Sequence, residues 1–181
     1  MVIKQIRWEK PEQGWWKLNT DGSWNAAVGS TVGRGLIRDN WGNWVTRFTR
    51  KLGSANSFIA EVWTLRDGLM LCVQRKLPIV IVEIDVKALV DAFNNPSYRN
   101  SVISPIFYDC KHLILQIPQF CIKHVYREAN KCVDWLANSG HSPSLDFIVH
   151  FVPLVSLIPT VEADCHGTWC NKLCPKLSCS S

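Results

Sequence analysis

Apolar and polar residues are mixed in three short segments of the first 51 residues, and each segment is bounded by turn-forming residues. Residues 15–20, 31–38 and 44–51 are therefore predicted as β-strands. A run of small residues at 25–30 separates the first two segments, and the turn-forming string Asp-Asn-Trp-Gly-Asn at 39–43 separates the last two. Because both connections are short, the pattern predicts an antiparallel meander of three strands.

The spacing of apolar residues then becomes helical. Apolar residues recur three or four positions apart from Phe58 to Cys72, which predicts an amphipathic helix over 57–75 that ends before Pro78. The continuous β-branched run at 79–82 is typical of a strand that is buried on both faces, as in a parallel sheet.

The remaining pattern predicts two helices, a strand and a last helix. We expect helices over 86–93 and 101–116, a strand over 120–126, and a helical stripe from Ala129 to about residue 139. The resulting order, βββαβααβα, combines a meander with βαβ crossovers. It therefore predicts an α/β fold with a mixed sheet flanked by helices, in one domain of this 181-residue chain.

The net charge of +5 is concentrated in the first third of the chain. Residues 1–51 contain nine Lys and Arg against four Asp and Glu, and several of the basic residues fall within 34–51. This region is either a solvated face of the sheet or a field that attracts phosphate groups. The charge balance does not decide between the two interpretations.

Four carboxylates lie at the edges of apolar segments: Asp21, Glu61, Asp85 and Asp134. Each has an ordinary structural alternative. Asp21 could form an Asp-Gly turn, and Glu61 could interact with a helix dipole. Asp85 could cap a helix, and Asp134 could lie on a solvated helical surface. Glu83 shares a strand face with Asp85 and is a weaker candidate.

Together, the four acids favour a metal site. Burying several unpaired carboxylates costs free energy, and a divalent cation between them offsets that cost. Mg²⁺ prefers carboxylate oxygens, and Mn²⁺ is an alternative. Two such ions, roughly 4 Å apart, activate a water and stabilise the leaving oxygen of a displacement at phosphorus. The set therefore predicts metal-assisted phosphodiester hydrolysis.

The strings around these acids resemble those of ribonuclease H type 1. They are Thr-Asp-Gly-Ser (20–23), Ala-Glu-Val-Trp (60–63), Glu-Ile-Asp (83–85) and Arg-Glu-Ala-Asn (127–130) followed by Asp134. The resemblance is closer to the plant reverse transcriptase-like branch of retroelement-derived proteins, and it covers about residues 8–140. It implies a five-stranded mixed sheet in the order 3-2-1-4-5 with helices on both faces.

The same resemblance implies an activity and its residues. The activity is two-metal-ion endonucleolytic cleavage of the RNA strand in RNA–DNA hybrids. Asp21 would bridge the two ions, Glu61 and Asp85 would complete one shell, and Asp134 would serve the other ion. The residues implied to contact nucleic acid are Gly22, Ser23, Arg127 and Asn130, the first two along the RNA strand.

Two departures from the family pattern leave a second interpretation open. The connection at 127–130 is too short for the His-bearing loop of many members, and His124 is expected on the preceding strand. The segment 93–101 contains Arg99 but no basic insertion, so the nucleic acid would be held by residues 34–51, Arg127 and Lys131. The alternative is a catalytically weak or inactive nucleic-acid-binding module derived from a retroelement ribonuclease H.

Residues 141–181 lie beyond the resemblance. They contain several prolines and four cysteines spaced C-x4-C-x3-C-x4-C, which is not a standard zinc spacing, and we expect a poorly ordered tail. Residues 1–16 lack the apolar core of a signal peptide, and no apolar run is long enough to span a bilayer. We therefore expect a soluble, intracellular, monomeric protein without a membrane partner, in either nucleus or cytoplasm.

Overall fold

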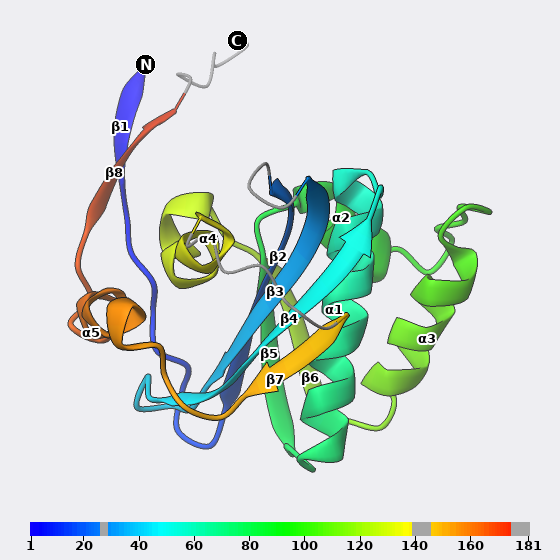
Figure 1. The fold of residues 1–181 in the computed structure, drawn as a ribbon, viewed down its shortest axis with the longest axis horizontal. Coiled ribbons are helices and arrows are strands. Elements are labelled where there is room, and N and C mark those ends of the chain that lie inside the picture. The colour runs from blue at the N-terminus through cyan, green and yellow to red at the C-terminus, as the bar shows by residue number, and fades with distance from the viewer. Residues whose placement is uncertain (26–28, 139–145, 175–181) are drawn as a thin grey trace, which may run out of the picture.

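A computed structural model describes residues 1–25, 29–138 and 146–174. A six-stranded mixed sheet with the order β6-β5-β2-β3-β4-β7 forms its centre (Figure 1). The strands are β2 (Trp16–Asn25), β3 (Ser30–Arg38), β4 (Trp44–Gly53), β5 (Ile79–Ile84), β6 (Gln119–His124) and β7 (Phe147–His150). The α/β class and the predicted 3-2-1-4-5 order of β2 to β6 are confirmed, and β7 adds a sixth strand antiparallel to β4.

The meander forms as the turn chemistry predicts. Asp39 and Gly42 close the tight connection between β3 and β4, where the Gly42 amide donates to the Asp39 carbonyl at 3.0 Å. Gly42 has a φ of +87°, which a glycine adopts without strain. In contrast, Asp21 and Gly22 do not form a turn, because β2 continues through both residues to Asn25.

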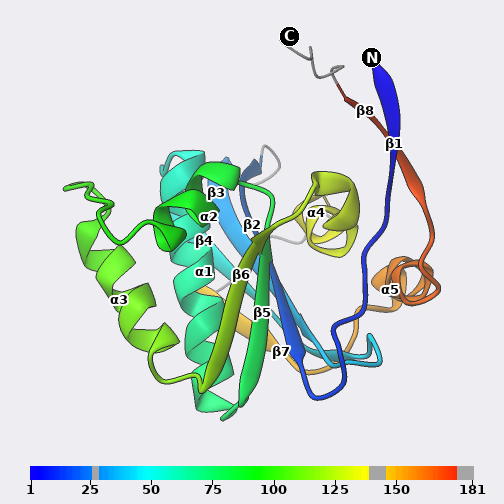
Figure 2. The same cartoon turned by 180° about the vertical axis from the view of Figure 1, so that it is seen from behind.

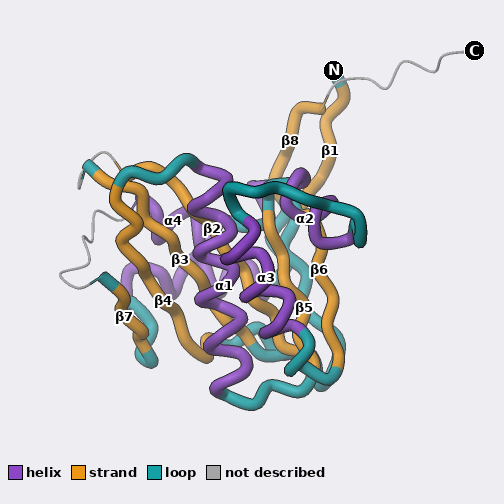
Figure 3. Tube along the Cα trace, turned by 90° about the vertical axis from the view of Figure 1, so that its right-hand side faces the viewer, coloured by secondary structure: helices purple, strands orange, loops and turns teal. Residues whose placement is uncertain are grey.

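Three helices cover one face of the sheet: α1 (Ser57–Gln74), α2 (Lys87–Asn94) and α3 (Ser104–Ile114) (Figures 2 and 3). The side chain of Asn56 caps α1 by accepting from the Ile59 amide at 2.8 Å. The apolar stripe of α1, including Leu65 and Leu69, is fully buried against Leu18 and the other inward residues of the sheet. This is the main core of the protein.

A smaller core lies on the opposite face. A short 3₁₀ helix, η1 (Arg127–Ala129), leads into α4 (Lys131–Asn138), and a second, η2 (Val155–Leu157), leads into α5 (Ile158–Cys165). The buried residues of this cluster are Leu36, Cys132, Val133, Leu136 and Leu157. Leu157 comes from beyond residue 140, so part of the expected tail contributes to the core of the domain.

The segment after residue 146 differs from the expected poorly ordered tail. It forms β7, α5 and β8 (Cys170–Cys174), and β8 pairs antiparallel with β1 (Val2–Ile6) at the start of the chain. A buried ion pair joins Arg38 Nη1 of β3 to Asp164 Oδ2 of α5 at 2.8 Å. Cys179 lies outside the described residues. None of the helices described here has both the length and the apolarity to cross a membrane.

Candidate active site

Strand register brings Asp21 and Asp85 to the same level of the sheet. In the parallel pair of β2 and β5, Asn19 lies beside Glu83, and two further residues along each strand lead to Asp21 and Asp85. Asp85 directly follows the last residue of β5. The two carboxylates therefore come from adjacent strands, as the sequence predicts.

Glu61 reaches these two acids from the second turn of α1. Its Oε1 accepts a hydrogen bond from the Gly22 amide at 3.0 Å. A Cβ atom at residue 22 would lie 2.6 Å from the carbonyl carbon of Ala60, so only glycine permits this close contact between β2 and α1. The glycine beside Asp21 thus accommodates the protein's own helix.

The three carboxylates form one compact group. Oxygen atoms of Asp21, Glu61 and Asp85 lie within 4.8 Å of one another, and the first two residues are buried. Burial is the main reason that the pKa of each is raised, and the charge of Asp85 adds to the shift at Asp21. The pKa of Glu61 lies well above its ordinary value of 4.5.

The group also contains an unsatisfied oxygen. Glu61 Oε2 is buried and has no hydrogen-bond partner among the residues that the structure describes. A buried carboxylate oxygen without a donor is unfavourable unless a cation completes its surroundings. The donor set, which consists only of carboxylate oxygens, fits Mg²⁺ or Mn²⁺.

The alternative roles of Asp85 and Glu83 are also resolved. The N-cap of α2 is Val86 and no side chain caps that helix, so Asp85 is not a capping residue. Glu83 lies outside the carboxylate group. Its side chain accepts from Lys17 Nζ at 2.5 Å and from Asn19 Nδ2 at 3.0 Å, within a buried polar network.

Asp134 lies near the group, although it is not one of its three members. Arg127 Nε donates to Asp134 Oδ1 at 2.8 Å, and Nη2 of the same guanidinium contacts that oxygen as well. The charge of Asp134 still contributes to the raised pKa of Asp21 and Asp85. The structure therefore brings three of the four predicted acids together and pairs the fourth with an arginine.

The residues expected to contact nucleic acid have different environments. Arg127 is exposed, and Ser23 donates from its hydroxyl to Asp21 Oδ2 at 3.0 Å. Gly22 is buried beneath α1. Asn130 is only 2% exposed, and its Nδ2 donates to the Thr20 carbonyl at 3.0 Å. Asn130 thus attaches the start of α4 to β2, which is a positioning role.

The expected basic surface over residues 34–51 is largely absent. Arg34, Arg38 and Arg47 are buried, and Arg50 pairs with Asp67 of α1. Both interpretations of this region, a solvated face and a phosphate-attracting field, are therefore wrong for the three buried arginines. Arg34 and Arg38 share one face of β3 with Leu36, and Arg47 lies opposite Leu36 on β4. Because Leu36 packs against Cys132 of α4, the three arginines lie on the sheet face that α4 and α5 cover.

Arg34 is a residue of the site that pattern reasoning missed. It is 2% exposed and lies directly opposite Asp21 in the register of β2 and β3. Burial lowers the pKa of Arg34, although the charge of Asp21 acts in the opposite direction, and neither terminal nitrogen has a hydrogen-bond partner in the described part of the chain. The register of the predicted hairpin was the one signal that could have placed it there.

A family model described as reverse transcriptase-like matches residues 19–140. This chain belongs to the reverse transcriptase-like family. The matched segment begins within β2, continues through α4 and contains all four predicted acids. It ends before β7, so this family match does not include the elements formed by residues 146–174.

One curated relative of this family member comes from Arabidopsis thaliana and is named "Putative ribonuclease H protein At1g65750". The two sequences are 33% identical over 146 residues, which is 81% of this chain. The chain spans 24% of the relative's length, so the relative is much longer.

Solved structures share the fold of this family member. RNase H1 from the archaeon Halobacterium salinarum has a TM-score of 0.61 at 17% identity, and covers 67% of this chain and 93% of its own. The RNase H domain of rv2228c from Mycobacterium tuberculosis has a TM-score of 0.63 at 19% identity, and the match covers 70% of this chain and 92% of that one. LC11-RNase H1, solved with an RNA/DNA hybrid, has a TM-score of 0.60 at 20% identity, and the match covers 67% of this chain and 92% of that one.

Proposed function

We propose that this protein is a metal-dependent endoribonuclease that hydrolyses the RNA strand of RNA–DNA hybrids. The observation that carries the proposal is the compact carboxylate group formed by Asp21 within β2, Glu61 on α1 and Asp85 just after β5, of which the first two are buried. Membership of the reverse transcriptase-like family supports it, as does a structural neighbour that was solved with an RNA/DNA hybrid. The relative named as a ribonuclease H protein points to the same activity.

The three acids would hold Mg²⁺ or Mn²⁺, and we assign Asp134 to the same site. The charges of Asp85 and Asp134 both raise the pKa of Asp21, and the charge of Asp21 in turn raises the pKa of Glu61. A bound divalent metal would supply Lewis-acid activation of water and stabilisation of the leaving oxygen. Asp21 would be a ligand of this metal together with Glu61 and Asp85.

Other residues of the chain would orient the acids and the substrate. The Gly22 amide fixes one oxygen of Glu61 and leaves the other, Oε2, for a ligand. The Ser23 hydroxyl orients Asp21. Arg127 is exposed beside the group and is suited to contact a phosphate oxygen, since guanidinium donors match that geometry.

One observation favours the second candidate, a binding module with little turnover. Arg127 is paired with Asp134 in this structure, and that pair must open before both residues take their proposed roles. The connection at 127–130 also forms only the short helix η1 and carries no His. A module of this kind would bind hybrids and cleave them slowly.

The deciding experiment is cleavage of an end-labelled RNA–DNA hybrid with Mg²⁺ or Mn²⁺, with free RNA and duplex DNA as other substrates. We expect hybrid-specific products from the wild type and a rate that is lower by about 100-fold or more for Asp21→Asn, because a metal ligand contributes several kcal/mol to the barrier. Asp91→Asn, on the exposed face of α2, is the matched control and should keep the wild-type rate.

Three outcomes separate the candidates. Hybrid-specific cleavage that requires Asp21 supports the enzyme. Tight hybrid binding without products at high protein concentration supports the binding module. Equal products from wild type and Asp21→Asn would indicate a contaminating nuclease and refute the catalytic assignment.

A further inference from the structure

The two ends of the described chain form a ribbon outside the main sheet. β1 and β8 pair antiparallel over five residues each, and together they make a separate two-stranded sheet. Figures 1 and 2 show these strands extending from the body beside α4, with the N-terminus at their far end. We call the pair, Val2–Ile6 with Cys170–Cys174, the ribbon.

The charge of the ribbon is entirely positive. Its ten residues include Lys4 and Lys172 and contain no acidic residue. The two lysines lie directly opposite each other in the strand register. Like charges in that arrangement repel each other, so the pair is destabilising unless a neighbouring group offsets it.

Two groups of the body partly offset this repulsion. The ammonium nitrogens of Lys4 and Lys172 each lie 4.8 Å from the centre of the Tyr126 ring, which interacts favourably with cations. Lys172 Nζ also pairs with Glu128 Oε2 at 2.8 Å. Lys4 is exposed, and no ion pair of Lys4 with an acid is found among the described residues.

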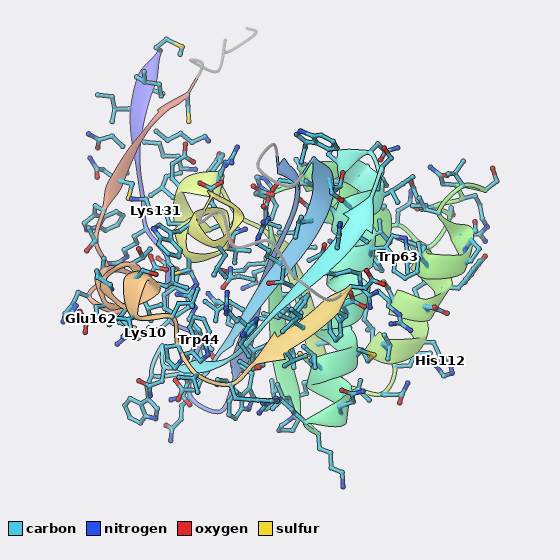
Figure 4. The ribbon with its side chains drawn as sticks, in the orientation of Figure 1. Lys10, Trp44, Trp63, His112, Lys131 and Glu162 are labelled. Carbon is cyan, nitrogen blue, oxygen red and sulfur yellow. The ribbon has the colours of Figure 1, made fainter. Side chains whose placement is uncertain are left out.

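The ribbon therefore carries one cation with an acidic partner and one without. The residues that contact the ribbon, Tyr126 and Glu128, flank Arg127, which is one of the residues assigned to the active site. His124, at the end of β6, stands edge-on to Tyr126 at 5.6 Å. Lys131 is the first residue of α4, and Figure 4 places it on the side of that helix that is nearer to the ribbon.

This cluster matters because the region expected to hold the substrate cannot do so. Arg34, Arg38 and Arg47 are interior, so they do not present positive charge to a polyanion. A nuclease of this class still needs cations beside its carboxylate group, since phosphate contacts supply most of the affinity for nucleic acid. An exposed lysine next to an aromatic ring, as Lys4 is, has the chemistry of such a surface.

We propose that the ribbon, together with Tyr126, is an accessory surface that binds the sugar-phosphate backbone of the hybrid on the Arg127 side of the carboxylate group. The inference rests on the proposed function for its substrate class. Lys4 supplies the charge that has no acidic partner among the described residues, and Tyr126, which faces both lysines, holds the two strands of the ribbon against the body. The contact is independent of base sequence, because it is made to phosphate groups.

The test measures the Kd of a fluorescent RNA–DNA hybrid for the full chain in EDTA, over a range of salt concentrations. We expect Lys4→Ala to weaken binding several-fold at low salt and to reduce the slope of log K against log salt by about 0.9, the value for one phosphate contact. Lys76→Ala is the matched control. Lys76 is exposed and follows the end of α1 that is distant from Glu61.

A second variant gives a result of opposite sign. Glu128→Gln removes the acid that pairs with Lys172, so the ribbon gains free positive charge and hybrid binding should become tighter. A purely structural role of the ion pair predicts weaker or unchanged binding for this variant. Circular dichroism confirms that each variant is folded.

Failure of the inference is distinct from failure of the proposed function. The ribbon is not a nucleic-acid surface if Lys4→Ala binds the hybrid as Lys76→Ala does, or if the wild type does not bind the hybrid at low salt. In either case the exposed apolar residues of the ribbon, Val2, Ile3 and Leu173, would point to a protein partner. If Asp21→Asn and the wild type show no difference in cleavage while the Lys4 effect is present, the ribbon binds nucleic acid and the catalytic proposal is wrong.

Discussion

Replacing Asp164 with alanine tests whether the segment after residue 140 is an integral part of the domain. Asp164 is buried on α5 and bonds to Arg38, a fully buried residue of β3 that lies 126 positions away in the sequence. Arg38 also donates to Asn19 Oδ1 at 3.0 Å and stacks on Trp8, with its guanidinium carbon 3.6 Å from the ring centre. These two contacts remain after the substitution, but neither carries a negative charge.

The expected loss of stability is large because the guanidinium cannot reach water. Leaving one member of a buried ion pair without its partner typically costs about 3–5 kcal/mol. The same substitution also removes a hydrogen bond, because the Cys132 thiol donates to Asp164 Oδ2 at 3.1 Å. For a domain of this size the unfolding midpoint should fall by roughly 6–20 °C.

The assay is thermal and denaturant unfolding of the full chain, followed by circular dichroism. Asp91→Ala is the control, since its pair with Lys87 is exposed and contributes about 0.5 kcal/mol or less. A double variant, Arg38→Met with Asp164→Leu, should recover much of the loss because no charge remains buried. If Asp164→Ala lowers stability no more than Asp91→Ala does, α5 is not coupled to the sheet and the reasoning fails.

Three further predictions concern the site itself. Gly22→Ala should separate β2 from α1, because its Cβ would lie 2.6 Å from the Ala60 carbonyl carbon. We expect the free energy of unfolding to fall by about 1–3 kcal/mol and hybrid cleavage to be lost. Unchanged cleavage would contradict the geometry. The pKa values of Asp21 and Glu61 are raised in the folded state, so the folded protein retains protons that the unfolded chain loses above about pH 4. Without metal, the free energy of unfolding should therefore fall as the pH rises through the raised pKa values of these two groups. Asp21→Asn should therefore gain stability over the wild type in EDTA as the pH rises above about 4, the ordinary pKa of the unfolded carboxyl. Mg²⁺ should reverse the order in melting experiments, and a pH-independent difference would refute this. Arg34→Met should raise the melting temperature, because it removes a buried guanidinium whose terminal nitrogens make no hydrogen bond among the described residues; a lower value would show that the attraction of Asp21 outweighs this cost.

The periodicity of the chain determined most of the elements and their order. A helix predicted over 57–75 is observed at Ser57–Gln74, and the β-branched run after Pro78 is the parallel strand β5. Local patterns are sufficient here because each element covers its own apolar face with its sequence neighbours. Asp21, Glu61 and Asp85 could be placed together for the same reason, as each lies at a defined point of a predicted element.

Only the tertiary structure decided what surrounds the polar residues of the other sheet face. Arg34, Arg38 and Arg47 alternate along their strands as exposed residues would, but α4 and α5, from more than 80 positions later, cover that face. The ion pair of Arg127 with Asp134 and the pairing of β1 with β8 are also set by contacts that no local pattern contains. Alternation along a strand determines which residues share a face, whereas the burial of that face depends on segments that pack against it from elsewhere in the chain.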